Sequence, residues 1–383
     1  MKFGRLILAN LFRKKVRLLL TLGSFAVAMF LFAFLAVVRD AFTRGGDLAS
    51  ANRLVAINRV SIIQPLPLSY ADKITRIPGV QYVTHDNWFG GVYQDEKNFF
   101  PQFVIDPANQ RLVFPELVVP DDQWNAFVKD RQGAIVGAST ARRFGWKIGD
   151  RIPIKSTIYG SAGAWEFNLV GIYHGARRQD DETQFWFQWD YFEERVPEHF
   201  KGQTGWYTVK LNSPDDALRV AKAIDAEFAN SPYETKTATE SAFAASWVKQ
   251  FGNIETLILA IGTVVFFTLL LVTGNTMAIS VRERTGELAI LKAIGFKDGS
   301  VLFLVLAEAL AIALCGGILG LALAVLAIPV LGSALAGLLP DLFLSKPVLA
   351  AGIGFALLVG ACSGILPGLG AMRLRVVEAF RRI

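Results

Sequence analysis

Four long runs of apolar residues constrain the fold of this chain more than any other feature. They cover Leu18–Val38, Thr256–Val281, Ala309–Leu339 and Pro347–Met372. A helix needs about 20 apolar residues to cross a bilayer, and every run is long enough. Helices in soluble cores rarely extend past about 20 residues without a polar face. The sequence therefore predicts an α-helical membrane protein with four transmembrane helices, over 18–38, 256–281, 300–331 and 347–372.

The first run could instead be a cleaved signal peptide. Its apolar core is longer than the roughly 7–15 residues of a signal-peptide core. Val38-Arg39-Asp40 follows it directly, without the small residues of a cleavage site. We therefore interpret the run as a retained anchor.

The charge distribution predicts how these helices are oriented. Residues 1–17 carry six Lys and Arg and no acid, 282–299 carries a net +1, 373–383 a net +3, and 39–255 a net −3. Short basic segments stay in the cytoplasm, whereas long domains translocate regardless of charge. We expect a multi-pass protein of the inner (plasma) membrane, with cytoplasmic termini, a short external loop over 332–346 and an extracytoplasmic domain over 39–255. The excess of Lys and Arg over Asp and Glu thus indicates the orientation in the membrane and gives no support to a nucleic-acid partner.

Residues 39–255 are predicted to form an α+β domain between helices 1 and 2. Strands are expected over 53–64, 80–93, 99–106, 134–137, 151–156, 165–173, 206–211 and 233–237. Helices are expected over 68–77, 121–129, 139–145 (capped by Ser139) and 213–229. The shared helix–strand order of 68–93 and 213–237 points to a domain split by an insertion near 112–200.

We find no catalytic, cofactor-binding or metal-binding residues in this domain. His85, His174 and His199 share no metal-ligand spacing. Asp180-Asp181-Glu182 has the character of a solvated loop, because calcium sites space their oxygen ligands further apart. The aromatic group Phe185, Trp186, Phe187, Trp189, Tyr191 and Phe192 is interpreted as core, with an apolar-ligand surface as the alternative.

The segment 282–299 predicts a short amphipathic helix over Glu287–Ile294. Leu288, Leu291 and Ile294 would give it one apolar face, and Gly295 would end it. Such a helix either lies on lipid headgroups or contacts a cytoplasmic partner, and the residues alone favour neither.

Small residues and one acid stand out within the predicted spans. Gly316 and Gly320, and Gly360, Gly364 and Gly368, recur every four residues, a spacing that permits close helix approach. We expect them to pack helices 3 and 4 together within one protomer; dimerisation is the alternative. Glu308 is the only acid inside a span, so we expect it to snorkel or to bond a neighbouring helix. No span offers it a titratable partner, which argues against a proton-coupled transporter.

Several of these segments resemble one known family. Ser280–Gly295 (SVRERTGELAILKAIG) closely resembles the signature of FtsX-like, MacB-like ABC permeases, with Leu288 and Ala289 as mild departures. Residues 9–21 (ANLFRKKVRLLLT) resemble the family's entry helix. Glu308 with Gly316-Gly317-x-x-Gly320 is similar to its third helix, and 367–382 to its ending. The resemblance covers both ends of the chain and is weakest in the external domain.

The resemblance implies a half-transporter with a MacB-like periplasmic core domain. Such permeases form dimers, with the seam at helices 1 and 2, and each protomer binds one cytoplasmic ATPase. The coupling helix seated on that ATPase would comprise Glu287, Leu288, Ile290, Leu291, Lys292, Ala293, Ile294 and Gly295. In this family, ATP-driven closure of the ATPases is passed through the membrane to the external domain, a process called mechanotransmission.

The chain contains no Gly-x-x-x-x-Gly-Lys-Ser/Thr phosphate loop. We therefore expect a separate ATPase chain, in two copies, to bind ATP and Mg²⁺. Our leading hypothesis is a permease for export or extraction of a substrate, such as efflux with a periplasmic adaptor or lipoprotein release. The alternatives are a transmembrane regulator of an external hydrolase and a membrane-anchored receptor without an ATPase. No motif names the substrate.

Overall fold

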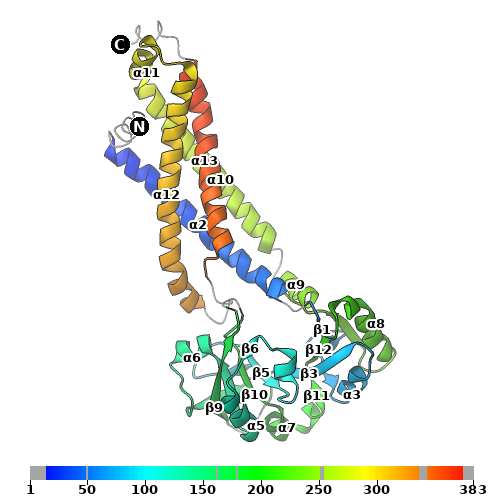
Figure 1. Ribbon diagram of the computed structural model, residues 1–383. Helices are drawn as coiled ribbons and strands as arrows, with labels where there is room; N and C mark the ends of the chain where they lie inside the picture. Colours follow the sequence, from blue (N-terminus) through cyan, green and yellow to red (C-terminus); the bar gives the residue numbers. More distant parts are fainter. Residues whose placement is uncertain are drawn as a thin grey trace. The chain divides into compact units, whose positions relative to one another are not determined.

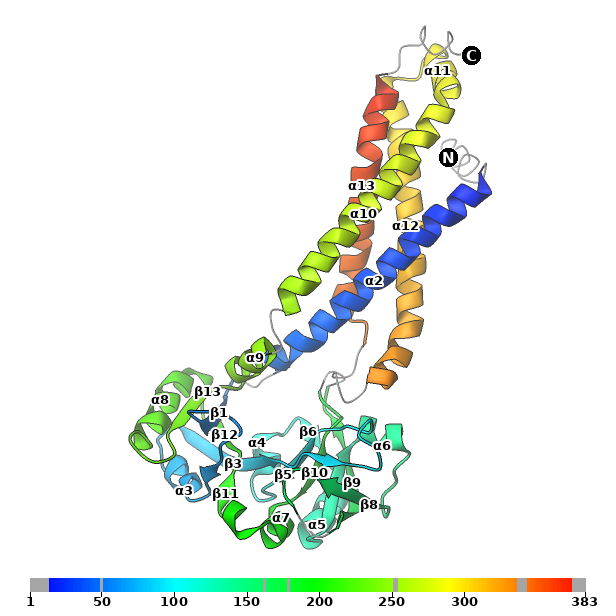
Figure 2. The ribbon, with the colours of Figure 1, turned by 180° about the vertical axis from the view of Figure 1, so that it is seen from behind.

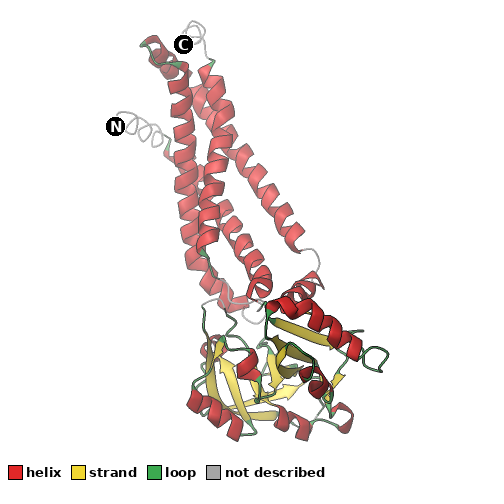
Figure 3. Cartoon of the chain, turned by 45° about the vertical axis from the view of Figure 1, so that its right-hand side comes forward, coloured by secondary structure: helices red, strands yellow, loops and turns green. Residues whose placement is uncertain are grey.

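The computed structural model describes residues 14–48, 51–160, 163–177, 180–250, 254–335 and 343–373 (Figure 1). Most of the predicted N-terminal segment 1–17 and of the tail 373–383, and part of the loop 332–346, lie outside these residues. The chain divides into two compact units. One contains the apolar helices, and the other contains residues 41–252 and is called the external unit, after the location predicted for it from the sequence. Figure 3 shows that the first unit is helical and that the second combines strands with helices.

The four predicted membrane helices are confirmed. They are α2 (Lys15–Leu48), α10 (Ile254–Glu283), α12 (Asp298–Leu335) and α13 (Lys346–Met372), and each is long and apolar enough to cross a membrane. α2 and α12 begin before the predicted positions 18 and 300, because charged residues join their first turns. A short helix, α11 (Thr285–Ala293), lies between α10 and α12 in the chain.

Glycines set the helix contacts in this unit. On α13, a Cβ at Gly360, Gly364 or Gly368 would lie 2.6–2.8 Å from Ala313, Ala309 or Leu302 of α12. These three glycines therefore pack α13 against α12, as expected. The expectation for α12 itself is wrong: Gly316 and Gly320 lie against Phe25, Ala26 and Met29 of α2. It is Gly317 that faces α13, through Ala356.

α10 and α13 also lie side by side (Figure 2). The Phe266 and Phe355 rings approach to 5.7 Å between centroids. A Cβ at Gly274 would be 3.8 Å from the carbonyl oxygen of Ser363. The glycine stripes thus serve packing within one chain.

The external unit is built on one long, mixed sheet, which confirms the predicted α+β class. The strand order is β13-β1-β12-β3-β5-β10-β7-β9-β8-β4, with β6 paired to β9 and a small separate pair, β11 with β2. The strands are β1 (Arg53–Asn58), β2 (Leu66–Pro67), β3 (Val80–Trp88), β4 (Gly91–Val92), β5 (Gln102–Ile105), β6 (Leu117–Val118), β7 (Gly133–Gly137), β8 (Arg151–Ser156), β9 (Trp165–Gly175), β10 (Phe185–Gln188), β11 (Gln203–Thr204), β12 (Trp206–Leu211) and β13 (Thr235–Thr239).

The sheet has two halves with different sequence origins. The antiparallel half β13-β1-β12-β3 comes from residues 53–88 and 206–239, and the other half comes from 91–188. In the second half, β5 with β10 and β7 with β9 are parallel pairs. The insertion was predicted near 112–200, whereas β4 and β5, which precede residue 112, already belong to the second half of the sheet.

Short helices connect these strands. They are α3 (Tyr70–Thr75), α4 (Gln110–Val113), α5 (Asp121–Lys129), α6 (Ala138–Phe144), α7 (Trp189–Arg195), α8 (Ala217–Glu227) and α9 (Glu240–Gln250), with 3₁₀ turns η1 (Glu198–Phe200) and η2 (Pro214–Asp216). α6 ends at Phe144, close to the predicted end at residue 145, and Gly145 is a left-handed C-cap with a φ of +69°. Its N-cap is Gly137 and not the expected Ser139.

Two sequence expectations for strands are wrong. β1 ends at Asn58 rather than at Gln64, because Asn58 turns the chain by accepting a hydrogen bond from the Val60 amide. The expected strand over 80–93 is divided at Phe89-Gly90, where Gly90 has a φ of +59°. We also assigned no strand to Phe185–Gln188 and no helix to Trp189–Arg195, where β10 and α7 lie.

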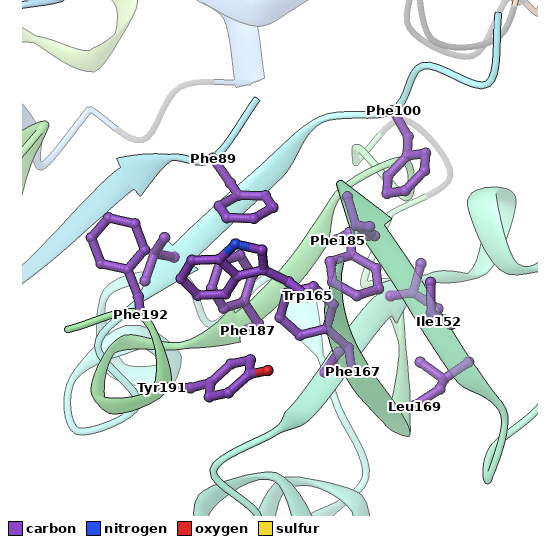
Figure 4. Close-up of a cluster of buried hydrophobic side chains, with 14 of the residues drawn as sticks. Phe89, Phe100, Ile152, Trp165, Phe167, Leu169, Phe185, Phe187, Tyr191 and Phe192 are labelled. Carbon is purple, nitrogen blue, oxygen red and sulfur yellow. The ribbon is translucent and has the colours of Figure 1, made fainter. Parts of the chain in front are cut away.

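The aromatic residues fill the core of the inserted half, as the core interpretation predicted. Phe185, Phe187 and Phe192 are fully buried, and Trp186, Trp189 and Tyr191 nearly so. Figure 4 shows the rings of Phe89, Trp165 and Phe187 gathered together. Phe89 meets Trp165 edge-on at 5.1 Å and Phe187 at 4.9 Å. Such edge-to-face pairs add stability beyond the burial of their area.

Asp86 is a buried acid in the middle of the sheet. It lies on β3 between β12 and β5, and desolvation raises the pKa of its carboxyl group to about 7. Hydrogen bonds from the side chains of Gln110, Thr208 and Trp206 oppose that rise, and the charge of Asp106 adds to it. The folded protein therefore holds a proton here that an unfolded aspartate releases near pH 4.

This proton predicts a pH-dependent stability of the external unit. Between about pH 4 and pH 7 the folded state binds more protons than the unfolded state, so the free energy of unfolding should fall as pH rises, by on the order of 4 kcal/mol from this group. All eight tryptophans lie in 39–255. Urea unfolding of the full chain, followed by tryptophan fluorescence, therefore reports this unit. Asp86→Asn should flatten the slope; an unchanged slope would show that Asp86 is ionised.

The glycine contacts predict a second, position-specific effect. A methyl group at Gly320 would overlap the backbone of α2, and overpacking of this kind typically costs about 1–3 kcal/mol. Gly320→Ala should therefore lower the thermal midpoint of the purified protein, measured by circular dichroism. Gly354→Ala is the matched control, since nothing lies within 4 Å of that Cβ. Equal midpoints for the two variants would contradict the close contact of α12 with α2.

Candidate functional site

The site that the sequence singled out is the helix α11, whose two ends are well defined. Arg284 is its N-cap residue, and the Leu288 amide bonds the Arg284 carbonyl at 3.0 Å. At the other end, Gly295 has a φ of +105°. The amides of Gly295 and Phe296 bond the carbonyls of Lys292 and Leu291. This paired arrangement is the Schellman motif, which requires the left-handed residue that glycine supplies.

The faces of α11 differ from the predicted ones. Leu288 and Ala289 are buried, and Leu291 and Lys292 are half-buried. Ile294, which we expected beside Leu288 on one apolar face, is instead 72% exposed, and Ile290 is 47% exposed. Glu287, Ala293 and Gly295 are exposed as well. Ile290 and Ile294 are one helical turn apart, so α11 presents two aliphatic side chains on one open face.

An ion pair fixes the start of α11 to α12. The Arg284 guanidinium donates to Glu308 Oε2 at 2.7 Å, and its Nε lies 3.5 Å from Glu287. The side chains of Arg284 and Glu308 are 14% and 9% exposed. Glu308 thus bonds a neighbouring helix, one of the two outcomes expected for it. The sequence did not identify Arg284 as the partner, because 24 residues separate the two.

A second set of ion pairs joins the end of α10 to α2. Glu283 accepts two hydrogen bonds from Arg17, at 2.7 and 2.9 Å, and one from Lys14 at 2.7 Å. These three residues were not predicted to form a group. The only signal in the chain is the adjacent Glu283-Arg284 at the end of an apolar run.

The end of α11 is tied down by Lys292. Its ammonium group donates to the carbonyl oxygen of Met372 at 2.6 Å and pairs with Asp298 at 2.7 Å. Met372 ends α13, where a cation compensates unpaired helix carbonyls, and Asp298 begins α12, where an acid is favourable. Lys292, one of the predicted coupling residues, therefore has a structural role that its neighbours Ile290 and Ile294 lack.

A pocket of about 350 Å³ with mixed polar and apolar walls lies beside these ion pairs. Arg17, Glu283, Arg284 and Glu308 line it, together with hydroxyl groups of α2 and α10. The pocket therefore brings the charged groups of three helices to one place.

The three histidines lie on separate elements of the external unit. Burial lowers the pKa of His85, against the Asp106 carboxylate 3.9 Å away. His174 is exposed beside Glu182, and His199 lies in the 3₁₀ turn η1. Among the described residues, no three His, Cys, Asp or Glu side chains are grouped to hold a metal ion.

The view of Asp180-Asp181-Glu182 as a solvated loop is wrong for Asp180. Its side chain is buried and accepts hydrogen bonds from the amide and the guanidinium of Arg177. Asp180 therefore binds Arg177, two residues after the end of β9.

The chain matches two family descriptions that together cover most of its length. Residues 18–227, more than half of the chain, match the MacB-like periplasmic core domain, and residues 259–376 match the FtsX-like permease C-terminal family. The first contains most of α2 and the sheet except β13, and the second contains all of α11, α12 and α13 and most of α10.

Three related proteins show how far the similarity extends. An uncharacterised ABC transporter permease of Methanocaldococcus jannaschii is 26% identical over 326 residues, covering 80% of this chain and 77% of that protein. The macrolide export ATP-binding/permease protein MacB of Chlorobaculum tepidum is 38% identical over 107 residues, 28% of this chain and 16% of that protein. The crystal structure of the periplasmic region of MacB from Actinobacillus actinomycetemcomitans covers 53% of this chain and 94% of its own, at 12% identity and a TM-score of 0.37.

The family matches agree with the features described above: four apolar helices, an α+β domain between the first two, and a short helix between the second and third. The resemblance noted from the sequence is thereby confirmed. This chain belongs to the MacB/FtsX family of ABC transporter permeases.

Proposed function

We propose that this permease couples ATP hydrolysis by a separate cytoplasmic ATPase to a conformational change of its external domain. The change would drive export or extraction of a substrate. ATP and Mg²⁺ would be bound by the ATPase; the 383 residues themselves contain no phosphate-loop motif. Each protomer would bind one ATPase and pair with a second permease protomer. Where a second membrane has to be crossed, a periplasmic adaptor would complete the assembly.

One observation carries this proposal: the exposed pair Ile290 and Ile294 on α11. On the membrane helices, exposed aliphatic side chains would face lipid or a second protomer. The segment 282–299 cannot enter hydrocarbon, since it carries seven charged residues. Exposed aliphatic side chains in such a segment indicate a surface that another molecule covers.

A protein partner fits this surface better than lipid headgroups do. A helix that lies on headgroups needs a wide apolar face and a basic polar face. α11 already turns Leu288 and Ala289 inward, and its open face includes the acid Glu287. A small aliphatic patch flanked by charge is typical of a protein interface.

The charge asymmetry supports an orientation for this assembly. With residues 1–17, 282–299 and 373–383 net positive, the positive-inside rule places α11 and both termini in the cytoplasm and residues 39–255 outside. That orientation would put α11 on the side of the inner (plasma) membrane where ATP is available.

Acidic substitutions on the open face of α11 should disrupt the ATPase contact. A carboxylate at position 290 or 294 would be buried without a partner, so Ile290→Asp and Ile294→Asp should each weaken association by at least roughly tenfold. The measurement is ATP hydrolysis that co-purifies with the tagged permease from its native host.

Ile63→Asp is the control, because Ile63 is an exposed isoleucine of the external unit. Unchanged co-purification of both α11 variants would rule out this face as the contact. Absence of any ATPase from the parent preparation would favour a receptor instead.

The orientation has its own test. In a background with Cys315 and Cys362 replaced by alanine, a cysteine at Gly160 should react with a membrane-impermeant maleimide in intact cells. A cysteine at Lys297 should react only after permeabilisation. Gly160 and Lys297 are both exposed in the structure, so access depends on the membrane alone. The reverse pattern would refute the proposed topology.

A further inference from the structure

Two adjacent residues of opposite charge connect three helices. Glu283 is the last residue of α10 and pairs with Arg17 of α2 and with Lys14, which directly precedes α2. Arg284 follows it and pairs with Glu308 of α12. Because Glu283 holds the end of α10 against α2, Arg284 is the first residue at which the chain can change direction.

Arg284 is also the joint between α10 and α11. It separates the two helices with non-helical backbone angles, φ −109° and ψ 14°. Any rotation of α11 relative to α10 must turn about this residue. Its guanidinium is held in a nearly buried site by Glu308, so the rotation would either drag α12 along or separate two poorly solvated charges. Separation of such charges is strongly unfavourable.

The two ion pairs between α11 and α12 have matching spacing. Arg284 at the start of α11 meets Glu308, and Lys292 near its end meets Asp298 at the start of α12. Eight residues separate the two cations and ten separate the two acids, about 12 Å and 15 Å along each helix. Their opposite order shows that α11 runs antiparallel to the first turns of α12. A single ion pair would let α11 rotate about that contact, whereas two ion pairs fix the direction of α11 relative to α12.

We propose that Arg284 and Glu308 are positioning residues that lock α11 to α12, so that a displacement of α11 moves α12 as a unit. The pair touches no substrate and acts through the helix it holds. The proposal rests on the proposed function for its biological meaning, because it assumes that an ATPase displaces α11. The lock itself can be measured without any partner.

The test is the distribution of distances between spin labels at Ala293 on α11 and Leu326 on α12. Both positions are exposed, and the labels are introduced as cysteines in a background free of Cys315 and Cys362. The distribution in the parent protein should be narrow. Glu308→Gln and Arg284→Gln should each broaden it, and the double variant should be no broader than either single variant, as expected for residues that act as one pair.

Arg282→Gln is the matched control. It removes the same charge two residues away, from an exposed arginine for which no ion pair is seen within the described residues. Its distribution should equal that of the parent. Arg284→Lys keeps the charge, so its distance distribution should be narrower than that of Arg284→Gln. If the arginine had a purely steric role, the two distributions would be equally broad. Should Glu308→Gln fail to fold, Glu308→Asp replaces it and should also broaden the distribution. Unchanged widths in the folded Glu308 and Arg284 variants would overturn the proposal.

A second measurement separates this proposal from the proposed function. With the ATPase bound, ATP should change the Ala293–Leu326 distances little in the parent protein, because the two helices move together. In Glu308→Gln, ATP should change these distances much more. The Glu308 variant should still bind the ATPase, because Ile290 and Ile294 are unchanged. If the parent protein bound no ATPase, the proposed function would be rejected and the proposed Arg284–Glu308 lock would be unaffected. Equal ATP-dependent shifts in parent and variant would reject the lock and leave the function intact.

Discussion

A carboxylate inside an apolar helix has to find a cation, and in this permease that requirement shapes the end of the helical unit. Glu308 lies ten residues into α12 and is almost completely buried. Its partner, Arg284, sits between α10 and α11 and is drawn to α12 by the pair. An unpaired charge at this depth is strongly unfavourable, so the Arg284–Glu308 ion pair determines where α11 begins relative to α12.

Close helix approach is the second constraint on this unit. The hydrophobic effect does not drive helices together in lipid, so contact depends on van der Waals packing. Gly316 and Gly320 let α12 meet α2, and Gly360, Gly364 and Gly368 let α13 meet α12. α12 therefore contacts α2 on one face and α13 on another, while its first turns are tied to α11. A displacement of α11 that moves α12 would therefore also act on α2 and α13.

The external unit depends on a different kind of packing. Its inserted half is held by fully buried aromatic rings from β10, α7, β9 and the turn after β3. The other half is a four-stranded antiparallel sheet whose core is mainly aliphatic. One continuous sheet joins them through β3 and β5, so the two halves share a backbone hydrogen-bond network. The buried Asp86 lies at that junction, paired in register with Ile105 of β5.

The sequence by itself determined the four spans, the α+β class of residues 39–255, the aromatic core and the family. These features depend on apolar length, on alternation and on a contiguous motif, all of which are local. It located α5 from Asp121 to Lys129 and the end of α11 at Gly295 for the same reason.

Tertiary structure alone decided which side chains meet. The partner of Glu308 is 24 residues away, that of Glu283 is 266 residues away, and Gly316 faces α2 rather than α13. Apolar periodicity placed Leu288 and Ile294 on one face of α11, yet only Leu288 is buried, because the ion pairs at Arg284 and Lys292 set how the helix is rotated. The sequence shows which residues are apolar and how they are spaced. Contacts between segments distant in the chain determine which of them are covered.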